Sequence, residues 1–118
     1  MNTPDVRIAD VWSSTTGRNI VRVERIEPRL YGSTWFEAHW RRLTKDGAPT
    51  SQTGKCGVRN FTTNRRLVER SGVRIGSIRE NGGARYRVTG ITGDRCDVEG
   101  AGGSEDLALS TVAAWGAV

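Results

Sequence analysis

The sequence predicts an all-β protein made of two tandem copies of one small unit, each of which ends in a short helical turn. Three observations lead to this fold class. Segments rich in β-branched and aromatic residues alternate in polarity, as half-buried strands do. Turn residues, with at least one glycine in each group, separate these segments. Three short motifs also recur in the same order along the chain, which is the signature of an internal repeat.

The strands with the clearest patterns are predicted at residues 19–26, 34–43 and 85–91. Turn signals that fit β-hairpins flank them, at residues 46–47, 81–83, 93–94 and 100–103. Serine or threonine near the start of TNRRLVER (63–70) and STVAAW (110–115) predicts a short helical turn at each place, because these side chains cap helix N-termini.

The repeat consists of three motif pairs. Arg22-Val23-x-x-Ile26 returns as Arg87-Val88-x-x-Ile91, Phe36-Glu37 as Val98-Glu99, and residues 61–67 as 109–115. Their common order favours a duplication, with copies at 5–70 and 73–117. The alternative is that short-stranded β domains resemble one another at this level of detail.

A unit of four or five short strands that closes with a one-turn helix resembles an SH3-like barrel, the class that includes Tudor and KOW modules. This resemblance implies two tandem barrels that bind through loops at one rim. The stretch VWSSTTGRNIVRVERI also resembles a pattern in small uncharacterised proteins of actinobacteria and their phages, through Val11, Trp12, Gly17, Arg18, Arg22, Val23 and Ile26. That second resemblance indicates a source and implies no activity.

Composition excludes several classes of function. No apolar run approaches the roughly 20 residues that cross a membrane, and the N-terminus lacks a signal-peptide pattern, so we expect a cytoplasmic protein. Cys56 and Cys96 have no CxxC spacing and are expected to be free thiols. With His39 as its only histidine, the chain is expected to have no metal, no cofactor and no catalytic site. A solvent-facing or hydrogen-bonded role is expected for His39.

The net charge of +5 is concentrated in one quarter of the chain. Residues 41–59 read as a polar, basic hairpin or loop inserted into the first copy, and residues 65–70 extend it through the predicted helical turn. This segment is expected to contact nucleic-acid phosphates; the alternative is a solvated charged loop. The candidate contact residues are Arg41, Arg42, Lys45, Lys55, Arg59, Arg65, Arg66 and Arg70.

The four tryptophans divide into core and surface positions. Trp12 and Trp115 are expected in the cores of the two copies. In the strand at 34–43, alternation places Phe36, Ala38 and Trp40 on the inward face and Trp35 on the outward face. Trp35 would then pack between the copies, bind a partner protein, or stack on a base.

Two hypotheses of function follow. The first is a non-enzymatic accessory protein that binds DNA or RNA, double-stranded DNA in particular, through the basic segment. The second is a protein-interaction module, such as a small phage protein that docks on an acidic surface of a host protein. A structural or capsid-associated protein that forms a homo-oligomer is a third alternative.

Overall fold

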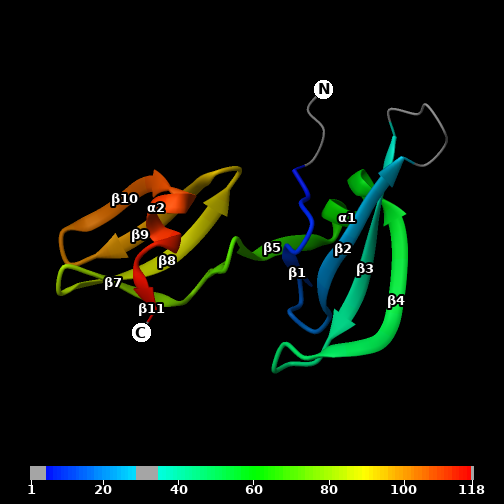
Figure 1. Ribbon diagram of the computed structural model, residues 1–118, viewed down its shortest axis with the longest axis horizontal. Helices are drawn as coiled ribbons and strands as arrows, with labels where there is room; N and C mark the ends of the chain where they lie inside the picture. Colours follow the sequence, from blue (N-terminus) through cyan, green and yellow to red (C-terminus); the bar gives the residue numbers. More distant parts are fainter. Residues whose placement is uncertain (1–4, 29–34, 118) are drawn as a thin grey trace. The chain divides into compact units, whose positions relative to one another are not determined.

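Two antiparallel β-sheets account for most of residues 5–28 and 35–117, the part of the chain that the computed structural model describes (Figure 1). The predicted all-β class is confirmed, since two short helices are the only ones among these residues. The chain divides into two units, residues 1–68 and 69–118. None of the described helices is long and apolar enough to span a membrane.

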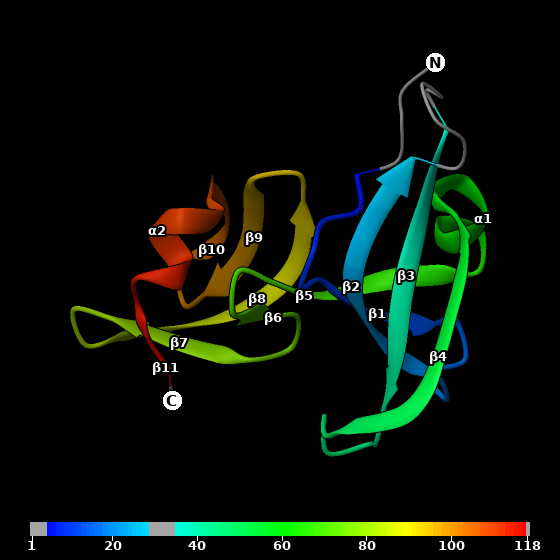
Figure 2. The ribbon, with the colours of Figure 1, turned by 45° about the vertical axis from the view of Figure 1, so that its right-hand side comes forward.

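The first unit is built from five strands and one helix. They are β1 (Val11–Ser14), β2 (Ile20–Pro28), β3 (Phe36–Leu43), β4 (Pro49–Gly57), α1 (Val58–Thr63) and β5 (Arg65–Arg70). The strands lie in the order β4-β3-β2-β1-β5, so β4 forms one edge of the sheet (Figure 2). β5 runs across the unit boundary, and its second-unit end pairs with β6 (Val73–Arg74).

The second unit repeats this order of elements. It contains β7 (Ile78–Asn81), β8 (Ala84–Thr92), β9 (Arg95–Gly100), β10 (Gly103–Ala108), α2 (Leu109–Ala113) and β11 (Gly116–Ala117). Its sheet has the order β10-β9-β8-β7-β11. In both units, therefore, three consecutive hairpins are followed by a short helix, and the last strand returns to pair beside the first.

The three predicted strands correspond to β2, β3 and β8, and all four predicted turns connect strands; Thr34 lies outside the described residues. The helical turn predicted at 110–115 overlaps α2. The one predicted at 63–70 is wrong, because residues 65–70 form β5 and the helix lies earlier, at α1. Val58 and Phe61 are both buried, and their spacing of three residues puts them on one helical face.

A β-bulge occurs at the same place in both units. The register between β2 and β3 shifts between Val23 and Arg25, and that between β8 and β9 shifts between Val88 and Gly90. A bulge inserts one extra residue into one strand and turns the following side chains to the other face. The bulge explains why the inward-facing valine and isoleucine are three residues apart in both motifs, Val-x-x-Ile, and not two.

The bulges also correct the alignment of the two copies. Val23 pairs with Trp40, and its counterpart Val88 pairs with Val98, so Val98 is equivalent to Trp40 and not to Phe36. The buried positions of the helices likewise match Phe61 with Val112. The predicted register of these two motif pairs was therefore wrong, although the order of the motifs was right.

The core of the first unit is centred on Phe61 and Trp12, whose rings meet edge to face with their centroids 5.6 Å apart. Trp12 is buried as predicted, and the partly buried Trp40 packs against this cluster. Phe36 is not in the core: it is 41% exposed, because β3 is buried only from Ala38 onward. In the second unit, the half-buried Trp115 packs on Tyr86 with ring centroids 5.0 Å apart.

Gly54 allows the indole of Trp40 to lie across β4. The two residues are paired in the register of β3 and β4. A Cβ atom at position 54 would lie 2.7 Å from Cε2 and Cη2 of Trp40, closer than real Cβ contacts. Glycine is therefore required here by a close approach of a rigid side chain and not by a turn.

We predict that Gly54→Ala lowers the free energy of unfolding by about 1 to 3 kcal/mol, the usual cost of overpacking. Urea denaturation followed by tryptophan fluorescence measures the change. Gly102→Ala is the matched control, since no atom lies within 4 Å of the added methyl group there. Equal stability of the two variants would show that the Trp40 ring can move aside without cost.

Candidate anion-binding pocket

Charged side chains cover the outward face of β2, β3 and β4. The bulge places Glu24 and Arg25 in succession on this side of β2, and β-alternation places His39 and Arg41 there on β3. The pairing of Arg25 with His39 and of His39 with Lys55 sets three nitrogen-bearing side chains in a row across three strands.

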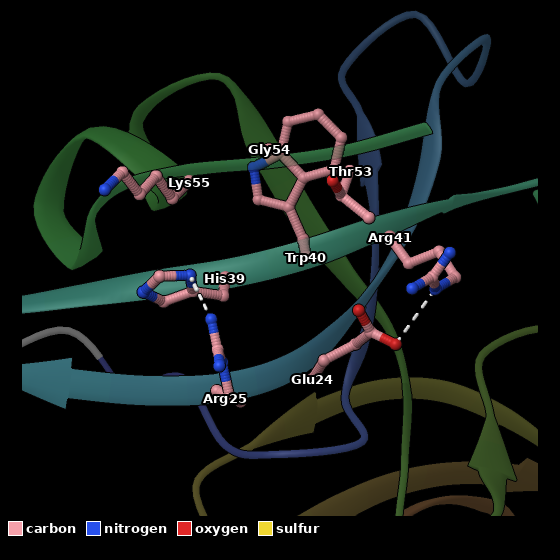
Figure 3. A pocket seen from close by; sticks show the side chains of 8 residues that line it. All are labelled: Glu24, Arg25, His39, Trp40, Arg41, Thr53, Gly54 and Lys55. Carbon is pink, nitrogen blue, oxygen red and sulfur yellow. Dashed lines mark hydrogen bonds and ion pairs between the residues drawn. The ribbon is translucent and has the colours of Figure 1, made fainter. Parts of the chain in front are cut away.

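An open pocket of about 580 Å³ lies on this face, and we call it the sheet pocket (Figure 3). Figure 3 shows Arg25, His39 and Lys55 grouped at one side of it, and Arg41 with Glu24 at the other. Its lining carries three cationic groups against one carboxylate. The lining residues are Glu24, Arg25, His39, Trp40, Arg41, Thr53, Gly54 and Lys55.

The hydrogen bonds in the row fix the tautomer of His39. An Nη2 atom of Arg25 lies 3.1 Å from Nδ1 of His39. Because a guanidinium group can only donate, Nδ1 accepts, and the ring proton is on Nε2. That nitrogen lies 3.5 Å from Oε2 of Glu27. His39 is thus hydrogen-bonded, as expected.

Acidic neighbours partner the cationic groups. Arg41 donates from Nε to Oε2 of Glu24 at 3.0 Å and from Nη1 to the carbonyl oxygen of Thr50 at 2.8 Å. Nζ of Lys55 lies 3.9 Å from Oε2 of Glu37, and that lysine side chain is 66% exposed. These exposed pairs hold the side chains in place at little energetic gain, because water screens them.

The predicted contact residues do not form one arm. Arg41 and Lys55 line the sheet pocket. On β3, Arg42 donates from Nη1 to Oε1 of Gln52 at 3.2 Å, and Lys45 is exposed in the turn that follows. The segment 41–57 is a true hairpin of the sheet, formed by β3 and β4, rather than an appendage to it.

The other four residues lie on α1 and β5. The guanidinium carbon of Arg59 is 5.1 Å from the centroid of the Trp35 ring. Arg65 is half-buried, with its guanidinium carbon 4.6 Å from the Phe61 ring centroid, and Arg66 is exposed. Arg70 is only 2% exposed and donates from Nη1 to the carbonyl oxygen of Gly93 at 3.1 Å. We therefore remove Arg70 from the candidate surface.

Sequence reasoning missed Arg25, together with the place of His39 in the pocket. Strict alternation along β2 would put Arg25 on the same face as Val21 and Val23, which are core residues. The bulge reverses this assignment, and the Val-x-x-Ile spacing was the signal that could have revealed it.

The cysteines play no part in the pocket. Both are free thiols, as predicted. Burial, together with the negative charge of Asp97, raises the pKa of the Cys96 thiol and makes it a poor nucleophile. Among residues 5–28 and 35–117, no group of three or more His, Cys, Asp or Glu side chains could hold a metal ion.

No protein-family model matches this chain, and no curated protein or solved structure is significantly similar to it. The function therefore has to be argued from the geometry and charge of the pocket.

Proposed function

We propose that this protein is a non-enzymatic nucleic-acid-binding accessory protein, whose first unit contacts phosphate groups through the sheet pocket. The observation that carries this proposal is the convergence of Arg25, Arg41 and Lys55 from three adjacent strands on one open pocket. Strands hold such side chains at fixed spacing, which suits a ligand with regularly repeated charges.

The distribution of charge supports an anionic ligand for the first unit in particular. Residues 1–68 contain twelve basic and six acidic residues, whereas residues 69–118 contain six and seven. A compositional preference for arginine would have raised the charge of both units. The positive excess instead belongs to the unit that carries the pocket, where it would attract a polyanion before contact.

The ion pairs around the pocket are compatible with phosphate binding. Exposed pairs of this kind are worth about 0 to 1 kcal/mol each, so a phosphate oxygen can replace a carboxylate at low cost. Release of counterions from the nucleic acid then supplies most of the affinity. Binding should consequently weaken steeply as the salt concentration rises.

The test is a triple variant, Arg25→Gln, Arg41→Gln and Lys55→Gln, compared with the wild type in DNA- and RNA-binding titrations at several salt concentrations. We expect weaker binding and a salt slope of log K that is shallower by about 2 to 3, since each lost phosphate contact contributes about 0.9. The matched control, Arg74→Gln, Arg85→Gln and Arg87→Gln, removes three exposed charges from the second unit. An unchanged slope in the first variant, or no binding by the wild type at low salt, contradicts the proposal.

A second candidate function is a protein-interaction module for an acidic partner. It is favoured by β4, a strand of nine residues that borders the pocket. Within the part of the chain that the structure describes, β4 pairs only with β3 and so forms the edge of the sheet. Such an edge can accept an added strand from a partner. Copurification of one stoichiometric protein that survives nuclease treatment would favour this candidate, and loss of the bound material on nuclease treatment would favour the first.

For the fold, we propose that the units are two SH3-like modules in tandem. The support is the shared sequence of four antiparallel strands, a short helix and a fifth strand that returns to the first. The common bulge position in β2 and β8 supports a duplication as their origin.

A further inference from the structure

Two consecutive large hydrophobic residues are exposed where β3 begins, Trp35 just before the strand and Phe36 as its first residue. Trp35 is 56% exposed and Phe36 is 41% exposed. Among the described residues, Ile8 is the only other large hydrophobic side chain exposed to this degree. Alternation places these two side chains on opposite faces, so Trp35 is the one that can extend the charged outward face, where an exposed aromatic ring is a candidate binding group.

Trp35 lies in line with the sheet pocket. Side chains two residues apart along a strand share a face, so Glu37, His39 and Arg41 follow one another on the outward side of β3, and continuing this alternation one residue before the strand puts Trp35 on the same side. His39 and Arg41 line the pocket. At about 3.3 Å per residue, the surface from Trp35 to Arg41 is roughly 20 Å long. The indole and the cationic groups therefore share one face and are separated by Glu37, whose Oε2 lies 3.9 Å from Nζ of Lys55.

Arg59 adds a second planar group at the aromatic end. Its guanidinium carbon lies 5.1 Å from the centroid of the Trp35 ring, within the range of a cation–π interaction. This contact ties the indole to α1 and puts a positive charge beside it. A base that stacks here would have a cation within reach of its own phosphate group.

We propose that the first unit binds single-stranded nucleic acid, with a base stacked at Trp35 and the adjoining backbone in the sheet pocket. The inference rests on the proposed function and names the form of the ligand. In a duplex, each base is stacked between its neighbours and is not available to a side chain. In a single strand the bases can turn outward, and aromatic residues beside a basic surface are the usual means of holding them.

The experiment compares an oligothymidylate of about 12 nucleotides, which has no internal structure, with a mixed-sequence duplex of the same length at the same low salt concentration. We expect the wild type to bind the single strand at least about tenfold more tightly than the duplex. Trp35→Ala should weaken single-strand binding about tenfold, since one stacked base contributes a factor of that order. Trp35→Phe should retain most of the affinity, because it keeps an aromatic face.

Ile8→Ala is the matched control, since it removes an exposed hydrophobic side chain of the same unit that does not line the sheet pocket. It should bind like the wild type. Equal or tighter binding of the duplex, or wild-type single-strand affinity in Trp35→Ala, overturns the inference. If either result is found but the triple variant of Arg25, Arg41 and Lys55 still loses binding, the proposed function stands and only the preference for single strands is wrong. Absence of binding to both probes at low salt overturns both.

Discussion

Phe61→Ala should lower the free energy of unfolding of the first unit by about 3 to 5 kcal/mol. The side chain is 0% exposed and lies at the centre of the core cluster. The Phe61 ring meets the ring of Trp12 edge to face, and the guanidinium group of Arg65 lies over the Phe61 ring. The variant loses the burial of the ring and leaves a cavity that a unit of this size cannot fill from elsewhere.

Urea denaturation followed by tryptophan fluorescence, to which the neighbouring Trp12 contributes, measures this change. Phe36→Ala is the matched control, because it deletes the same ring at a position that is 41% exposed. We expect it to change stability by less than about 1 kcal/mol. If Phe36→Ala were the more destabilising of the two, Phe36 would lie in the core, as alternation had predicted, and the core would not be centred on α1.

The strands were predictable wherever one face is buried and the other is polar. β2 and β8 show this clearly, since valine and isoleucine alternate there with charged residues. β4 was not separable from a loop, because PTSQTGKCG is polar throughout and its alternation is invisible. It becomes a strand through its pairing with β3, a tertiary effect that local propensity does not encode.

The helix was misplaced for a related reason. Thr63 looked like an N-cap, and RRLVER contains good helix formers. Residues 65–70 instead complete the sheet as β5, where backbone pairing outweighs the small differences in helix propensity. The helix forms before them, where Val58 and Phe61 can both enter the core. Its N-cap, Gly57, makes no side-chain hydrogen bond, so the usual signal for its start is missing.

The candidate site was predictable only in its overall charge. Counting basic residues pointed to the unit that carries the sheet pocket, but it could not tell which of them share a face. That depends on the bulge at Val23, which turns Arg25 outward to join His39 and Lys55. Nor could it separate contact residues from structural ones, and Arg70 is the plainest example.

Arg70→Ala should accordingly act on stability and not on binding. Its side chain is buried, and its guanidinium group donates to the carbonyl oxygen of Gly93 in the turn between β8 and β9. Truncation leaves that oxygen without this donor and leaves a cavity along the path of the side chain. We expect a loss of about 2 to 5 kcal/mol in the free energy of unfolding.

Arg66→Ala provides the comparison, since Arg66 lies on the same strand and is exposed. It should leave stability within about 0.5 kcal/mol of the wild type. Both variants remove one arginine charge, but only Arg70 is buried. A difference in their free energies of unfolding, measured by chemical denaturation, therefore reports the effect of the buried side chain and not of the lost charge. Under conditions where Arg70→Ala remains folded, its affinity for single-stranded nucleic acid should equal that of the wild type. A stable Arg70→Ala variant with weakened binding would instead return this residue to the contact surface, and would require its side chain to leave the turn when the ligand binds.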